Sequence, residues 1–135
     1  MKKIILSVVT VVALIPGALI LRAQDSVEVD GEHYEVEFEN NEVRVLRVTY
    51  GPGERSVMHD HPERVVVFLT DQKAVFATPD GKSTQLNHKA GEVKYVPAGS
   101  HLLQNIGDKP LEVIVVELKG KPAAKTPEEA KALLN

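Results

Sequence analysis

Short stretches of alternating hydrophobic and polar residues fill the chain from Ser26 onward, which is the pattern of β-strands with one buried face. Clusters of Gly, Pro, Asp and Asn separate these stretches and favour turns. The expected strands are residues 27–29, 34–39, 42–50, 59–61, 65–69, 74–78, 83–86, 93–96, 101–105 and 111–118. Their number and short spacing predict an all-β sandwich or barrel.

Three local features refine this prediction. Asp30-Gly31 is a hairpin signal and predicts a tight turn between the first two strands. In residues 42–50 the apolar positions change from odd to even numbers, as a β-bulge in that strand would produce. The run 65–69 is continuously apolar, which predicts a strand buried on both faces.

The two ends of the chain differ from this pattern. Lys2 and Lys3 precede an apolar run over residues 4–21, and Ala23 offers a small residue at a cleavage point. Residues 1–23 are therefore expected to be a signal peptide cut after Ala23, which predicts a periplasmic or secreted protein. The alternative is a retained membrane anchor, and only then would the protein contact a membrane. Residues 24–120 form the expected domain, and residues 121–135 a tail with a short helix.

Composition limits the chemistry. The 135 residues suffice for one domain, and they include no cysteine, so any metal must be held by His, carboxylate or amide groups. The formal charge is −3, and loss of the first 23 residues leaves 13 basic against 19 acidic side chains, a charge of −6. An acidic chain without a basic patch repels phosphate backbones, so we expect no nucleic-acid partner.

Three of the five histidines lie in two clusters that also contain Gly or Pro. His59 and His61 are two apart, so on a strand both side chains point to the same face and can reach one cation. His101 opens another strand after the turn Pro97-Ala98-Gly99, which gives a third imidazole a route to the same place. The alternative for His59-Asp60-His61 is a solvated loop rim.

The two clusters resemble the two motifs of the cupin family. Gly53, five residues, His59, one residue, His61 is similar to the first motif. Gly91, five residues, Pro97, then His101, three residues, Asn105 is similar to the second. The resemblance implies a cupin jelly-roll barrel (a double-stranded β-helix), a metal held by His59, His61 and His101, and a homodimer.

The sequence departs from the family pattern at two points. A glutamate ligand usually follows the second histidine by four or five residues, where this chain has Val65 and Val66, and the second motif is one residue shorter before His101. Glu63 is a candidate fourth ligand or base, with a solvated surface position as the alternative. Three neutral imidazoles without a carboxylate favour Fe, Ni, Cu or Zn as the single divalent ion.

The resemblance leaves the function open between classes. The first expectation is an enzyme similar to the three-histidine cupin dioxygenases, acting on a small molecule. The pocket residues expected for it are Val65, Val67, Tyr95, Leu103 and Asn105. The alternatives are a non-catalytic module that binds a small molecule or a metal, and a metal-free barrel. No candidate for a catalytic base other than Glu63 or a metal-bound hydroxide is evident.

Overall fold

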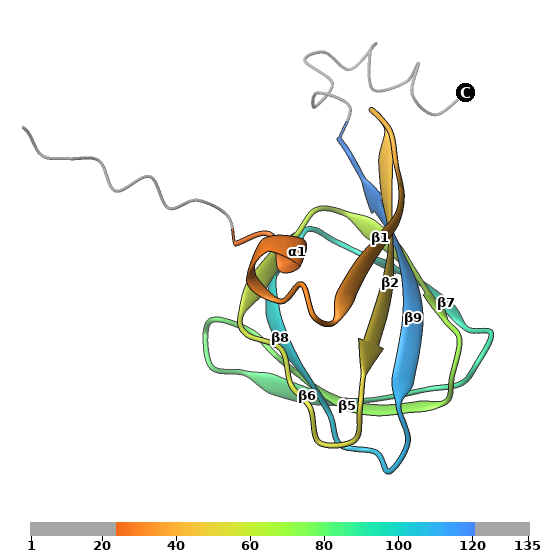
Figure 1. Cartoon of the computed structure of the whole chain (residues 1–135). Helices are drawn as coiled ribbons and strands as arrows, with labels where there is room; N and C mark the ends of the chain where they lie inside the picture. The colour runs from red at the N-terminus through yellow and green to blue at the C-terminus, as the bar shows by residue number, and fades with distance from the viewer. Residues whose placement is uncertain (1–23, 121–135) are drawn as a thin grey trace, which may run out of the picture.

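Two antiparallel sheets curve around a common interior in the computed structural model, which describes residues 24–120 (Figure 1). One sheet has five strands in the order β1 (Tyr34–Glu39), β2 (Val43–Tyr50), β9 (Leu111–Leu118), β4 (Arg64–Phe68) and β7 (Val93–Val96). The other has four, in the order β3 (His59–His61), β8 (Gly99–Asn105), β5 (Gln72–Ala77) and β6 (Ser83–His88). The all-β prediction is confirmed.

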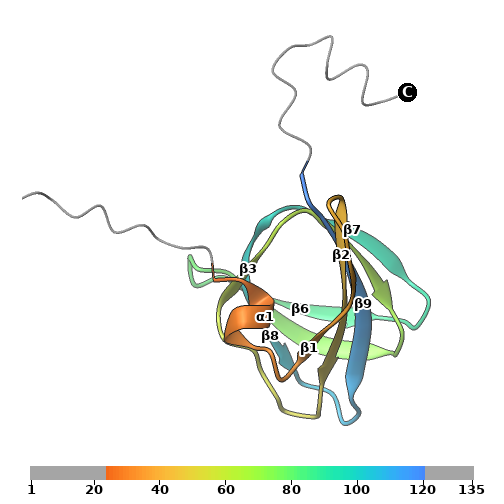
Figure 2. The same cartoon turned by 45° about the horizontal axis from the view of Figure 1, so that its top comes forward.

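The ends of the chain lie outside the described residues, so the predicted signal peptide and C-terminal helix are not part of this structure. Within residues 24–120, no helix has both the length and the hydropathy that a membrane span requires. The helix α1 (Ser26–Val29) covers the barrel beside β1 and β3, as Figure 2 shows from a second direction.

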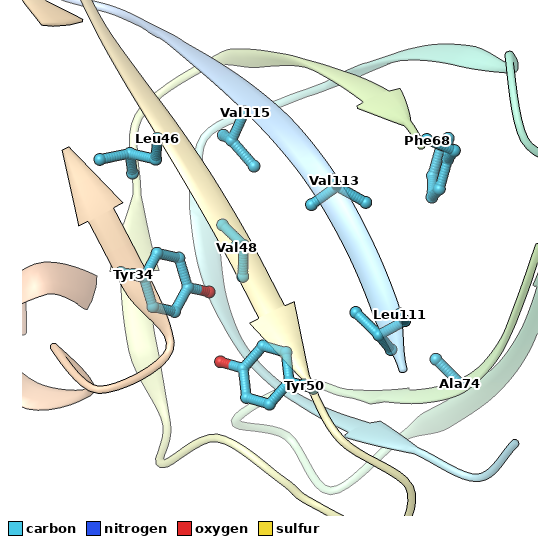
Figure 3. Close-up of a cluster of buried hydrophobic side chains, with 9 residues drawn as sticks. All are labelled: Tyr34, Leu46, Val48, Tyr50, Phe68, Ala74, Leu111, Val113 and Val115. Atoms are coloured by element: carbon cyan, nitrogen blue, oxygen red, sulfur yellow. The ribbon is translucent and has the colours of Figure 1, made fainter. Parts of the chain in front are cut away.

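Strands β2 and β9 supply most of the hydrophobic core. They run antiparallel over eight residue pairs, and alternate residues of each point into the barrel. The buried core, drawn in Figure 3, consists of Tyr34, Leu46, Val48, Tyr50, Phe68, Ala74, Leu111, Val113 and Val115. Burial of each large side chain stabilises the fold by roughly 1.5–3 kcal/mol, so these residues hold the five-stranded sheet against the four-stranded sheet, which carries His59, His61 and His101.

The prediction of a strand at residues 27–29 and a hairpin at Asp30-Gly31 is wrong. Ser26–Val29 forms a single helical turn, because the Asp25 side chain accepts a hydrogen bond from the Val27 N–H (3.0 Å) and caps the turn. A Cβ atom at Gly31 would lie 2.8 Å from the carbonyl oxygen of Val27. The glycine therefore permits the chain to leave this turn, and it does not form a hairpin.

The predicted bulge exists, but it lies in β1 and not in residues 42–50. Val36 pairs with Leu46 and Phe38 with Val45, so Glu37 is the extra residue, whereas β2 pairs with β9 without interruption. The shift in apolar positions along β2 arises because both of its faces carry apolar residues. The prediction that residues 65–69 are buried on both faces is also wrong, since Val65 to Val67 are half-buried and Leu69 is exposed.

Candidate metal centre

Pairing of β3 with β8 brings the three histidines together. His59 lies directly opposite His101 in this antiparallel pair, and His61 is two residues along on the same face. The three side chains are enclosed in the barrel, with residue exposures of 0%, 5% and 5% for His59, His61 and His101. One ring nitrogen of each lies within 4.8 Å of the other two. The structure therefore places three imidazoles where one cation can bind them.

The loop that leads into β3 is joined to the end of β8. Gly53 has φ +80° and Gly91 has φ +89°, a backbone conformation that other residues rarely adopt, at the first position of each histidine motif. The Gly53 N–H donates to the carbonyl of Asn105 (3.0 Å), and the Asn105 N–H donates to the carbonyl of Glu54 (2.9 Å). The start of the first motif is thus fastened to the end of the second.

Hydrogen bonds fix the tautomers of His59 and His61. His59 Nδ1 lies 2.8 Å from the carbonyl oxygen of Val57, and His61 Nδ1 lies 2.5 Å from a carboxylate oxygen of Glu117. Both partners only accept, so both Nδ1 atoms carry the proton and both Nε2 atoms present lone pairs. These two Nε2 atoms are 3.0 Å apart. Two lone pairs at that distance repel each other unless a cation or a proton lies between them.

The geometry of this pair matches a metal ion. Nitrogens bound at about 2.1 Å and at a right angle to each other lie roughly 3.0 Å apart, so the observed separation fits two neighbouring positions of one coordination sphere. The Tyr34 hydroxyl also points to this place, 3.0 Å from His59 Nε2 and 3.5 Å from His61 Nε2. Its single proton can satisfy only one of the two nitrogens.

Behind His61, a chain of paired charges extends from the buried Glu117 toward the surface. Glu117, which is 1% exposed, accepts from His61 through one carboxylate oxygen and from Arg44 Nε through the other (2.7 Å). Arg44 in turn donates through Nη2 to Asp25 (2.6 Å). Burial opposes ionisation of Glu117, but the hydrogen bonds from His61 and Arg44 outweigh it and lower its pKa. The carboxylate orients His61, as the carboxylate partner of a metal-binding histidine does.

His101 has a different partner. Its Nδ1 lies 3.3 Å from Nη2 of Arg64, and a guanidinium can only donate. The neutral ring of His101 therefore carries its proton on Nε2. Its faces lie between the Phe76 and His61 rings, with centroid distances of 4.5 and 5.1 Å. A metal bound through Nε2 of His101 must displace this proton, so the third histidine is less well prepared than the other two.

All three histidines are held neutral by their surroundings. Burial lowers the pKa of His59 and of His61. Burial, together with the neighbouring His59, His61 and Arg64, lowers the pKa of His101 to about 2. Neutral imidazole is the form that binds metal ions, so the cluster is ready to do so at neutral pH without first losing a proton to solvent.

A cavity of about 350 Å³ lies beside the histidines. Tyr34, His61, Arg64 and His101 contribute polar groups to one part of its wall, whereas most of the wall is apolar and comes from both sheets. Tyr50 also lines it, and in Figure 3 the Tyr34 and Tyr50 hydroxyls point toward each other. The cavity is large enough for a small molecule that touches the cluster.

The structure distributes the other predicted site residues differently. Tyr95 and Leu103 line the cavity, but Val65 and Val67 do not, because β4 turns their side chains to its other face and presents Val66. Glu63 is exposed and does not belong to the histidine group. Asn105 has a structural role instead, since its Nδ2 donates to the carbonyls of Tyr50, Gly51 and Lys109.

The remaining two histidines each stack on an aromatic ring. His33 precedes β1 and stacks on Tyr50 at 4.2 Å between ring centroids. His88 ends β6, stacks on Phe68 at 4.1 Å, and lines the cavity. Neither belongs to the group of three.

Comparison with solved structures decides the fold. A cupin domain from Bordetella pertussis Tohama I is 27% identical and covers 64% of this chain and 92% of its own, with a TM-score of 0.61. This chain has the cupin fold. A double-stranded β-helix protein from Klebsiella pneumoniae is 25% identical and covers 65% of this chain and 76% of its own, with a TM-score of 0.54. An RmlC-like cupin from Methanocaldococcus jannaschii, at 20% identity and TM-score 0.51, covers 74% and 84% and shows the fold alone.

Sequence comparison adds a partial match. Oxalate decarboxylase from Bacillus subtilis (strain 168) is 39% identical to this chain over 69 residues, which are 47% of this chain and 18% of the relative. The alignment thus spans less than a fifth of that curated relative. No protein-family model matches the sequence.

Proposed function

We propose that this cupin binds one divalent transition-metal ion through His59, His61 and His101 and holds a small molecule against it in the adjoining cavity. The observation that carries the proposal is the pair of Nε2 atoms of His59 and His61, which are 3.0 Å apart while both Nδ1 atoms face acceptors. A cation between them replaces the repulsion of two lone pairs with two bonds.

The ligand set selects the kind of metal. Glu117 is not available as a ligand, because His61 and Arg44 occupy its two oxygens, and no other carboxylate of residues 24–120 groups with the three imidazoles. Imidazole ligands alone favour Fe, Ni, Cu or Zn over harder ions such as Mn²⁺. When bound, the ion supplies a Lewis acid and, in the case of iron or copper, a redox centre.

A titration with Co²⁺ tests this proposal. Chelator-treated, untagged wild-type protein should take up one equivalent, detected by visible absorption and by calorimetry. The double variant His59→Ala/His101→Ala should take up none while its circular dichroism stays that of a folded barrel. His88→Ala is the matched control, because it removes an imidazole from the same cavity wall outside the cluster. A folded wild type that binds no ion, or a double variant that still binds one, contradicts the proposal.

Catalysis is the second candidate. The polar groups of Tyr34 and Arg64 converge on the histidines within a mostly apolar cavity, an arrangement that favours catalysis over binding alone. The reaction class that the family resemblance suggests is that of the cupin dioxygenases. Oxygen consumption by the iron-loaded protein with a panel of small organic acids and phenols distinguishes this from binding alone. Consumption should be lost in the Tyr34→Phe and His59→Ala variants if these groups act in it.

Two further predictions concern export of the protein and its oligomeric state. Export rests on residues 1–23 and is tested by N-terminal sequencing of the mature protein, which should begin at Gln24. A homodimer is expected from the family resemblance and is tested by light scattering in solution.

A further inference from the structure

Arg64 is a buried cation without an acidic partner among the described residues. The residue is 4% exposed, and its guanidinium donates to the carbonyls of Pro62 and Pro97 and to His101 Nδ1, at 3.3 to 3.4 Å. No carboxylate of residues 24–120 lies within 4.0 Å of it. A buried charge with only long hydrogen bonds to neutral groups lowers the stability of the fold, so we expect it to be kept for a function.

The neighbouring strand shows why the acid is missing. Arg44, Glu117 and Arg64 are directly opposite one another across β2, β9 and β4, so one carboxylate stands between two guanidinium groups. Glu117 directs both of its oxygens to Arg44 and His61. Arg44 also has Asp25 as a partner, whereas Arg64 has neither acid.

The free donors of Arg64 are suited to a planar anion. Its observed contacts use Nη1 twice and Nη2 once, which leaves an N–H on Nε and another on Nη2 without a partner among the described residues. Nε and Nη2 lie side by side on one edge of the guanidinium, and such an edge matches the two oxygens of one carboxylate. Ser26 Oγ is the only fully enclosed side-chain N or O atom of residues 24–120 that lacks a partner, so Arg64 Nε is not sealed off by protein.

We infer that Arg64 binds the anionic group of the cavity's ligand, and that this ligand is a small monocarboxylate with an apolar body. The carboxylate satisfies the guanidinium beside the histidines, and the apolar body fills the rest of the cavity, whose wall is mostly hydrophobic. The inference rests on the proposed function for its metal, since three neutral imidazoles leave the ion its full charge of +2. Two like charges in one buried site strengthen the attraction for an anion.

Benzoate and its neutral analogue benzamide test this inference by calorimetry, with and without one equivalent of Ni²⁺. The metal-loaded wild type should bind benzoate and bind benzamide far more weakly. Arg64→Gln should lose benzoate affinity by roughly ten- to a hundredfold, as expected for hydrogen bonds to a charged group. The matched control Arg55→Gln removes an exposed arginine and should change nothing.

Nickel affinity provides a second readout that does not depend on the organic ligand. Removal of the neighbouring positive charge in Arg64→Gln should tighten Ni²⁺ binding in the absence of benzoate. In the wild type, benzoate and Ni²⁺ should each raise the affinity of the other by the same factor.

Failure of this inference is distinguishable from failure of the metal proposal. Equal benzoate affinity in wild type and folded Arg64→Gln, equal affinity for benzoate and benzamide, or no benzoate binding at millimolar concentration overturns the role of Arg64. Absence of Ni²⁺ uptake by both proteins overturns the metal proposal instead, and the comparison of wild type with Arg64→Gln in metal-free protein then still decides whether Arg64 binds the carboxylate.

Discussion

The two sides of the histidine cluster are built on opposite charges. His61 faces Glu117, which is backed by Arg44 and Asp25, whereas His101 faces the guanidinium of Arg64. The carboxylate accepts from Nδ1 of His61 and leaves its Nε2 free, whereas the guanidinium donates to Nδ1 of His101 and leaves the proton of that ring on Nε2. The first side supports a cation, and the second side opposes one and attracts an anion.

Arg44 and Arg64 also differ in whether the fold supplies an acidic partner. Both point into the barrel from the five-stranded sheet and both flank Glu117. Arg44 is fully paired and therefore belongs to the framework, while Arg64 keeps free donors at the cavity. A buried charge that the fold itself satisfies is structural, and one that it leaves unsatisfied is available for a ligand.

Of the substitutions that test this comparison, Glu117→Gln should lower the free energy of unfolding most. The substitution leaves Arg44 and His61 without their shared carboxylate, and loss of one partner of a buried ion pair costs about 3–5 kcal/mol. Urea unfolding measures the change. Glu112→Gln is the matched control on the same strand, because it removes a half-exposed partner of Arg47 and should cost at most about 1 kcal/mol. Equal losses for the two variants would show that the buried carboxylate has no special role.

A comparison of Arg44→Met with Arg64→Met should give the next largest effect. Arg44→Met removes hydrogen bonds to two carboxylates and should lower the free energy of unfolding by about 2 kcal/mol. Arg64→Met removes an unpaired buried charge, so its cost should stay below about 1 kcal/mol, or the variant should be more stable. An Arg64→Met variant as unstable as Arg44→Met would mean that Arg64 is also part of the framework.

The pH dependence of the metal-free protein should give a smaller effect. His101 has a pKa of about 2 in the fold against an ordinary value of 6.5, so below pH 6.5 the unfolded chain binds a proton that the folded one does not. Stability should therefore fall as the pH is lowered, by about 1–2 kcal/mol between pH 7 and pH 5. Thermal unfolding of the wild type and of His101→Gln, each measured between pH 5 and pH 7, tests this prediction. The stability of the variant should depend less on pH than that of the wild type. Identical profiles would exclude His101 as a source of the acid sensitivity.

Much of the fold and the three histidines could be predicted from local pattern. Residues 93–96 and 111–118 are strands as expected. The resemblance of the two histidine clusters to the cupin motifs predicted the group that His59, His61 and His101 form. The predicted strand at residues 27–29 is absent for a local reason as well. The Asp25 side chain caps a helical turn there, and this cap outweighs the strand preference of Val27 and Val29.

The residues that complete the site were missed because they are distant in sequence. Tyr34 contacts His59 across 25 residues, Arg64 contacts His101 across 37, and Glu117 contacts His61 across 56, and no short motif records such a pairing. Glu117 did leave a signal, because it is the charged member of an inward alternation that otherwise consists of Leu111, Val113 and Val115. Its partners required the strand register, which the sequence pattern does not contain.

The position of the metal in a crystal tests the central claim most directly. Crystals grown with Ni²⁺ or Zn²⁺ and measured at the absorption edge should show one anomalous peak, about 2.1 Å from both His59 Nε2 and His61 Nε2. A structure grown with excess metal that shows no peak between these nitrogens would contradict the claim. A peak only at the other group of potential ligands, Asp30, Glu32 and His33, would contradict it as well.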